Sequence, residues 1–134
     1  MVPVDEGIVK SYSAKSIVIA TGARSRELPS LKQDGKRIIG YREAMTLAEQ
    51  PSSMVVVGSG AIGSEFANFY QSIGTNVTLI EFLPRIVPNE DEEVSKQLER
   101  SFKKMKMKVM TDSSVESVDI AGDKCIVKVK SPKG

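Results

Sequence analysis

The middle of this 134-residue chain carries the segment MVVVGSGAIGSE, residues 54–65. Its first four residues are apolar and mostly β-branched, as in a parallel strand that is covered on both faces. Gly58, Gly60 and Gly63 follow with the spacing G-x-G-x-x-G, which is typical of a tight turn between a strand and a helix. We therefore predict a buried strand, a glycine-rich turn and a helix, in this order.

The residues after the turn extend this pattern to a complete βαβ unit. Gly74 is expected to end the helix, because glycine readily adopts the left-handed conformation past a helix end. A second strand is predicted over residues 77–81, and its last residue, Glu81, lies close to the ~20 positions expected between the glycines and the acidic residue of a dinucleotide-binding unit. The helix is expected to bury an apolar stripe, which consists of Ile62, Phe66, Phe69, Tyr70 and Ile73.

The residues of the turn have separate physical roles in holding a dinucleotide. Gly58 allows the tight turn, Gly60 leaves room for a pyrophosphate, and Gly63 lets the helix pack close to the sheet. The free N–H groups and the dipole at the helix start attract phosphate groups. A plain strand–helix turn without a ligand is the alternative interpretation. The predicted cofactor-binding residues of the turn are Gly58, Ser59, Gly60, Ala61, Ile62 and Gly63.

Two carboxylates complete the candidate site. Glu81 can accept hydrogen bonds from the adenosine ribose, and its charge repels a 2′-phosphate, which favours NAD over NADP. Arg85 is close enough in sequence to leave NADP open, and a solvated acid at a strand end is the other interpretation of Glu81. Glu65 is predicted in the first turn of the helix, where it either complements the helix dipole or lies near the nicotinamide end of the cofactor.

Composition argues against several other functions. Apolar residues make up 40% of the chain and charged residues 27%, which is ordinary for one globular domain. The net charge of +2 gives no reason to expect a nucleic-acid partner. The chain has no histidine and a single cysteine, Cys125, so we expect no histidine catalysis, no metal site and no internal disulfide. No segment matches a membrane span or a signal peptide, so a cytoplasmic location is expected.

Further elements are predicted on either side of the βαβ unit, and the expected fold class is α/β: a Rossmann-like parallel sheet flanked by helices. Residues 16–20 predict a strand and residues 41–49 a short helix. A second amphipathic helix is expected from residue 90, with Val94, Leu98, Phe102 and Met105 on its inner face. The remaining predicted elements are a third strand at 107–110 and an antiparallel β-hairpin near the C-terminus, with strands 115–120 and 125–130 around a turn at 121–123.

Taken in order, five segments of the chain resemble the flavoprotein pyridine nucleotide-disulfide oxidoreductases. The resemblance extends over residues 11–130 and nearly the whole chain. Ala61 and Gly63 resemble the NAD-using branch of this family that acts on dihydrolipoamide. The five segments are SAKSIVIATGA (13–23), RELP (26–29), MVVVGSGAIGSE (54–65), LIE (79–81) and PRIVP (84–88).

The resemblance implies an activity for the parent enzyme. Members of that branch oxidise dihydrolipoamide carried by a lipoyl protein and pass the electrons through a disulfide and FAD to NAD. The family residue matching Glu65 lies near the nicotinamide–flavin contact. A homodimeric parent enzyme is also implied, with FAD bound mostly outside this segment. Other branches stay open, among them NADH oxidases, mercuric reductases and soluble transhydrogenases, as does a dinucleotide-binding module without catalysis.

The resemblance also predicts how the chain is organised. Residues 1–30 are expected to match the end of the family's FAD-domain portion, with its A-T-G strand and a linker, and residues 31–134 to match the NAD-binding domain without its last strand. The segment lacks the family's redox disulfide motif, so no catalytic residue is predicted in it and it is expected to be inactive alone. We expect the strand at 16–20 to fill the vacant sheet edge, within the chain or by exchange between two chains.

Overall fold

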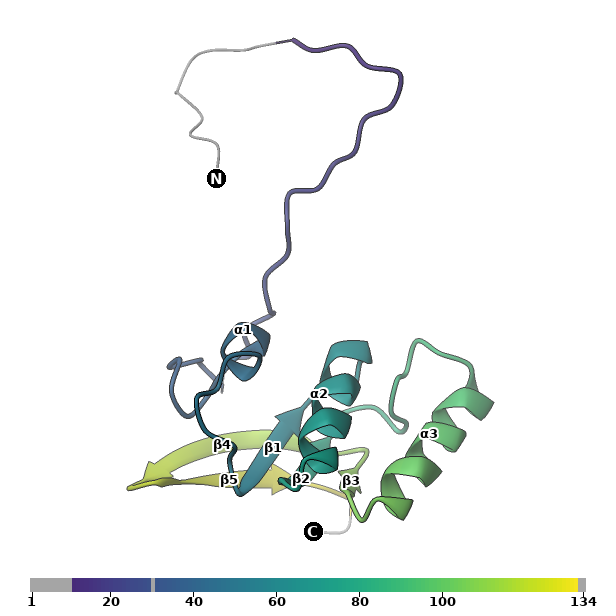
Figure 1. The fold of residues 1–134 in the computed structure, drawn as a ribbon. Helices are drawn as coiled ribbons and strands as arrows, with labels where there is room; N and C mark the ends of the chain where they lie inside the picture. The colour runs from purple at the N-terminus through teal and green to yellow at the C-terminus, as the bar shows by residue number, and fades with distance from the viewer. Residues whose placement is uncertain (1–10, 30, 133–134) are drawn as a thin grey trace.

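The computed structural model of the chain describes residues 11–29 and 31–132. Within these residues, α2 and α3 lie on one side of a sheet and a hairpin follows at the C-terminal end (Figure 1). In chain order the elements are α1 (Tyr41–Ala44), β1 (Ser53–Val57), α2 (Ala61–Ser72), β2 (Asn76–Ile80), α3 (Glu92–Lys104), β3 (Lys108–Met110), β4 (Ser114–Ala121) and β5 (Lys124–Lys130).

Three strands form the parallel sheet that the sequence predicts. The strand order is β1-β2-β3, and the register runs from Ser53 opposite Asn76 to Val57 opposite Ile80. α2 joins β1 to β2, and α3 joins β2 to β3. Both crossovers advance in the same direction across the sheet, so right-handed connections place both helices on the same face. The predicted α/β fold with a parallel sheet is therefore confirmed.

The core lies between this face of the sheet and the two helices. Side chains from β2 and both helices meet there, joined by two residues of the loop after β2. Burying such apolar side chains contributes roughly 1.5–3 kcal/mol for each large one. The fully formed cluster consists of Ala67, Tyr70, Val77, Leu79, Ile86, Val87, Phe102 and Met107.

The opposite face of the sheet is open at its edge strand β1. Val55 and Val57 point to this face and are 40% and 42% exposed. The expectation of a strand covered on both faces is therefore wrong for β1. The reason is that both helices cover the other face, while β4 and β5 form a separate two-stranded sheet.

α2 contacts the sheet through only part of the predicted stripe, together with two small residues outside it. Ser64, Ala67 and Tyr70 are its buried residues, and Phe66 packs partly against the core. Ile62 and Phe69 are 60% and 55% exposed, so the predicted stripe is wrong at these positions, as it is at the exposed Ile73. The close approach of helix and strand selects small side chains at Ser64 and Ala67 and leaves Ile62 and Phe69 outside, while Tyr70 is buried in the core as predicted.

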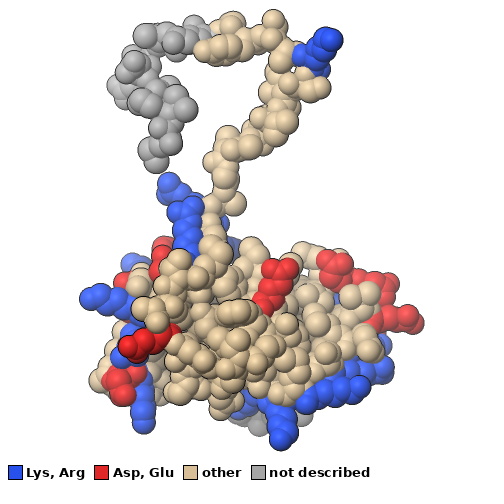
Figure 2. All heavy atoms as spheres, in the orientation of Figure 1, with Lys and Arg blue, Asp and Glu red and all other residues tan. Residues whose placement is uncertain are grey.

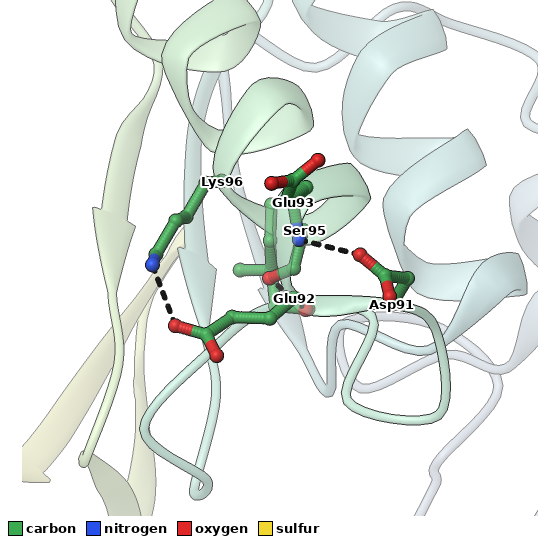
Figure 3. A network of polar contacts seen from close by, with 6 residues as sticks. Asp91, Glu92, Glu93, Ser95 and Lys96 are labelled. Atoms are coloured by element: carbon green, nitrogen blue, oxygen red, sulfur yellow. Dashed lines mark hydrogen bonds and ion pairs between the residues drawn. The ribbon is translucent and has the colours of Figure 1, made fainter.

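α3 begins at a capped N-terminus and buries a face slightly rotated from the predicted one. The Asp91 carboxylate accepts a hydrogen bond from the Glu93 N–H at 2.8 Å (Figure 3). Phe102 is buried and Leu98 packs against the core, as predicted. Val94 is 53% exposed, contrary to prediction, and the neighbouring Ser95 is buried because its hydroxyl donates to the carbonyl oxygen of Ile86 at 2.7 Å.

The C-terminal hairpin is confirmed. β4 and β5 pair antiparallel, and Ala121 lies opposite Lys124 across a two-residue turn. The first turn residue, Gly122, has φ +61°, as a type II′ turn requires. α1 is shorter than predicted: it ends at Ala44 and not near residue 49.

The predicted strand at residues 16–20 is absent. This segment has no strand pairing, and Figure 1 shows the N-terminal part of the described chain leading away from the sheet. Ile17, Val18 and Ile19 are 75%, 85% and 84% exposed. A short apolar segment forms a stable strand only beside a partner that satisfies its backbone, and it finds none among residues 11–29 and 31–132. The expectation that it fills the sheet edge within the same chain is therefore wrong.

Candidate nucleotide-binding site

The glycine turn begins where β1 ends, beside the end of β2. Gly58 has φ +95°, a conformation that L side chains rarely adopt, and its N–H donates to the carbonyl oxygen of Ile80 at 2.8 Å. A side chain at Gly63 would place its Cβ 2.0 Å from the carbonyl oxygen of Gly58. The two outer glycines therefore have the predicted roles: one makes the turn, and the other permits the close packing of α2 against it.

The middle glycine faces free space. Gly60 has φ −60°, which any residue can adopt, and a Cβ built on it meets no atom within 4 Å. Its backbone precedes the first residue of α2, and no side chain caps this helix. The first turn of an α-helix has N–H groups without partners inside the helix. Ala61, Ile62 and Gly63 form that turn, and the first intrahelical donor is Ser64, whose N–H bonds to the Gly60 carbonyl.

Glu81 is fixed at the end of β2 by a network of hydrogen bonds. Its Oε2 accepts from the Ser59 N–H at 2.8 Å and from the Ser59 hydroxyl at 2.6 Å, and its Oε1 accepts from the Leu83 N–H at 2.8 Å. The residue is 7% exposed and Ser59 is fully buried. The sequence places Ser59 and Glu81 22 positions apart, and the parallel pairing of β1 with β2 brings them together.

Glu81 carries its charge despite this burial. Burial alone raises the pKa of a carboxyl group, but the hydrogen bonds from Leu83 and Ser59 to the charged form outweigh it and hold the pKa of Glu81 below its usual value. An ionised carboxylate accepts hydrogen bonds and donates none, so it suits the hydroxyl groups of a ribose.

The loop after β2 closes over the turn. The Val87 N–H donates to the Ser59 carbonyl at 2.9 Å, and the Ser64 hydroxyl donates to the same oxygen at 3.0 Å. Val87 has φ +40°, which is strained for a β-branched residue and is held by its buried side chain and this bond. Sequence patterns carried no signal for Leu83, Ser64 or Val87 as parts of the site, because Leu83 and Val87 contribute backbone N–H groups and the Ser64 hydroxyl bonds to a backbone carbonyl.

Arg85 is engaged elsewhere in the same loop. Its guanidinium donates from Nη2 to the carbonyl oxygen of Pro88 at 2.9 Å. This contact holds the cation against its own loop, while the Glu81 carboxylate is satisfied by Ser59 and Leu83.

Glu65 lies outside the first turn of α2, contrary to prediction. The helix begins at Ala61, so Glu65 is its fifth residue, and the first turn contains no acid. Its exposed side chain borders an open groove of about 420 Å³ between α1 and α2. Apolar residues line most of that groove, among them Met45, Leu47, Phe66 and Phe69.

The residues present fit the pyrophosphate and ribose of a dinucleotide. Open space at Gly60 matches the close approach of a pyrophosphate, and the uncapped start of α2 supplies N–H donors and the positive end of a helix dipole. The ionised Glu81 lies at the end of the adjacent strand, where the ribose of a bound dinucleotide is recognised. The turn thus offers open space and N–H donors beside a carboxylate that can accept hydrogen bonds.

Comparison with known proteins agrees with this geometry. The chain belongs to the pyridine nucleotide-disulphide oxidoreductase family, which it matches over residues 3–134. Among curated relatives, dihydrolipoyl dehydrogenase of Chlorobaculum tepidum is 46% identical over 121 residues, which is 90% of this chain and 26% of that protein. Dihydrolipoyl dehydrogenase of Zymomonas mobilis is 43% identical over 118 residues, 88% of this chain and 25% of that protein.

Solved structures share the fold. The crystal structure of LpdA from Mycobacterium tuberculosis is 34% identical, with a TM-score of 0.74 over 81% of this chain and 24% of that one. The water-forming NADH oxidase from Lactobacillus brevis, solved with NADH, has a TM-score of 0.66 at 24% identity over 83% of this chain and 25% of that one. The chain spans about a quarter of the length of the curated relatives it matches. In the part of the chain that the structure describes, no helix is both long and apolar enough to cross a membrane.

Proposed function

We propose that this chain is the NAD(H)-binding segment of a dihydrolipoyl dehydrogenase. In the whole enzyme, electrons from dihydrolipoamide pass through a disulfide and FAD to NAD, and this segment holds the NAD. The proposal is supported by identities of up to 46% to proteins named dihydrolipoyl dehydrogenase. The nicotinamide and flavin carry the hydride chemistry, and the protein binds and orients them. The segment alone is expected to have no turnover.

The observation that carries the proposal is the pairing of the open glycine turn with the fixed charge of Glu81. Space at Gly60 admits the pyrophosphate, and the Glu81 carboxylate, held by Ser59 and Leu83, receives ribose hydroxyls. A 2′-phosphate in the same position meets a like charge, so we propose NAD rather than NADP as the cofactor. The contact between Arg85 and the Pro88 carbonyl supports this choice, because it holds the nearby cation in its own loop.

The proposal includes partners and location. The parent enzyme is proposed to be a homodimer that accepts dihydrolipoamide from a lipoyl protein and binds FAD mostly outside this segment. Residues 1–30 are proposed to belong to its FAD-domain portion and residues 31–134 to its NAD-binding domain. A cytoplasmic location is proposed, with which the lone exposed thiol of Cys125 is compatible.

For this chain by itself, the proposed partner is a second copy of the same chain. The two copies would exchange their N-terminal segments. Ile17, Val18 and Ile19 are exposed in the single chain, and β1 has a neighbour on one side only. Exposed β-branched segments and free sheet edges tend to pair with each other. The segment of one copy would then extend the sheet of the other beside β1.

Titration of the purified chain with NADH and NADPH, followed by nicotinamide fluorescence, tests the cofactor proposal. We expect saturable binding with NADH preferred, no measurable binding in Gly60→Val, and an affinity about tenfold lower in Glu81→Ala, since a hydrogen bond to a charged group contributes about 1.5–3 kcal/mol. Circular dichroism of each variant reports whether it is folded. A folded wild-type chain that binds neither nucleotide, or a Gly60→Val chain that binds as well as wild type, would overturn the proposal.

A further inference from the structure

The buried hydroxyl of Ser59 is not needed for the turn itself. The turn depends on backbone conformation at Gly58 and on the absence of a Cβ at Gly63. The Ser59 backbone already bonds through its N–H to Glu81 and through its carbonyl to Val87. Its side chain nevertheless makes the shortest contact of the site, 2.6 Å to Glu81 Oε2.

The acceptor sites of the Glu81 carboxylate are unequally used. A carboxylate has about four lone-pair sites, two on each oxygen. Oε2 accepts two hydrogen bonds, both from Ser59, while Oε1 accepts one from the Leu83 N–H. A ribose hydroxyl would therefore be received at Oε1. The Ser59 hydroxyl, by contrast, serves to hold the other oxygen in place.

We propose that Ser59 is a positioning residue that determines nucleotide specificity by tethering the Glu81 carboxylate at the ribose site. This inference rests on the proposed NAD(H) binding. A glutamate side chain that is free to rotate can swing away and admit a 2′-phosphate at little cost. With Oε2 held on both sides by Ser59, the charge stays where the phosphate of NADPH has to enter, and like-charge repulsion excludes it. The hydroxyl thus adds a third hydrogen bond to the two backbone N–H bonds, from Ser59 and Leu83, that hold the charge in place.

The tether also affects the protonation of Glu81. Hydrogen bonds to the charged form lower the pKa of a carboxyl group, so loss of the Ser59 hydroxyl is expected to raise the pKa of Glu81. Arg85, the nearest basic residue along the chain, donates to the Pro88 carbonyl and not to Glu81. This effect is measurable by NMR titration of the side-chain carboxyl carbon and requires no nucleotide.

The test compares Ser59→Ala and Ser59→Cys with wild type and with Ser95→Ala. The alanine variant removes the hydroxyl, and the cysteine variant fills its volume with a weak donor. Ser95 is a matched control, because it is also buried and its hydroxyl donates to a carbonyl, that of Ile86, away from Glu81. The ratio of the dissociation constants for NADPH and NADH is measured for each protein by fluorescence titration, and the Glu81 pKa by NMR.

We expect both Ser59 variants to lower that ratio by about fivefold or more, because the Glu81 carboxylate loses one of the hydrogen bonds that fix it, and to raise the Glu81 pKa. Ser95→Ala is expected to leave both values unchanged. Wild-type preference for NADH with an unchanged ratio and an unchanged pKa in the Ser59 variants would overturn the role of Ser59 while leaving the proposed function intact. Absence of nucleotide binding to the folded wild type would overturn both.

Discussion

Gly60 and Gly63 belong to one motif but answer different physical demands. A Cβ at Gly63 would lie 2.0 Å from the backbone oxygen of Gly58, whereas a Cβ at Gly60 would meet nothing within 4 Å. Gly63 is therefore needed by the fold of the protein, and Gly60 is needed only when a ligand approaches. A stability measurement and a binding measurement should separate the two roles.

We expect Gly63→Ala to lower the free energy of unfolding by about 1–3 kcal/mol, because the added methyl forces the start of α2 away from the end of β1. Urea unfolding followed by circular dichroism measures this. Gly60→Ala is the matched control, and its stability should be unchanged or raised by up to about 1 kcal/mol, since its φ of −60° suits any residue. Equal stabilities of the two variants would contradict the packing role of Gly63.

Among the elements, the two longer helices end in the same backbone conformation, but only one of these ends can be predicted from the amino-acid sequence. In α2 the Thr75 N–H bonds to the Tyr70 carbonyl, and Gly74 takes the left-handed conformation. In α3 the Met107 N–H bonds to the Phe102 carbonyl, and Lys106 takes that conformation with φ +61°. The sequence predicts the first end because glycine favours it, and it gives no such signal at Lys106.

The start of α3 depends on one cap, and the ion pair beside it contributes little. We expect Asp91→Ala to lower the free energy of unfolding by about 1 kcal/mol, because the Glu93 N–H loses its acceptor. Lys96→Gln removes the exposed ion pair with Glu92, also visible in Figure 3, and should cost at most about 0.5 kcal/mol. Thermal and urea unfolding of both variants measure this difference. A larger loss in Lys96→Gln than in Asp91→Ala would contradict the role of the cap.

At the scale of the whole molecule, charge and apolar surface are separated. Figure 2 shows acidic side chains near one end of α3 and basic side chains near the other, and beside them a mostly uncharged surface over α2 that acidic atoms interrupt. The acids complement the positive end of the helix dipole, as predicted, and the lysines at 103, 104, 106 and 108 are exposed. Ile62 and Phe69 contribute exposed apolar area to α2, and Ile17 to Ile19 contribute more on the N-terminal segment.

Self-association of the chain tests strand exchange. We expect sedimentation velocity to show a concentration-dependent dimer. Val18→Lys should raise its dissociation constant at least tenfold, which corresponds to about 1.4 kcal/mol, because it places an unpaired charge at the paired sheet edge. Phe69→Lys is the matched control, since it places the same charge on another exposed apolar site. Loss of the dimer in Phe69→Lys but not in Val18→Lys would assign association to α2 and contradict strand exchange.

The βαβ unit, the hairpin and the candidate binding residues in the glycine turn were predictable from the amino-acid sequence. These features arise from local rules: β-branched runs, glycine spacing, helical periodicity and turn residues, all of which act over a few positions. Glu81 was predictable for the same reason, because its distance from the glycines reflects the length of one helix and one strand.

The contacts of individual side chains depend on how the elements pack in three dimensions. The outward turn of Ile62 and Phe69 follows from the close approach of α2 to β1, and the exposure of Val55 follows from helices covering one face of the sheet. The bond between Ser59 and Glu81 exists because parallel pairing brings two strand ends together. Residues 16–20 have the pattern of a strand but no partner within the described part of the chain, and a strand is stable only when another segment satisfies its backbone.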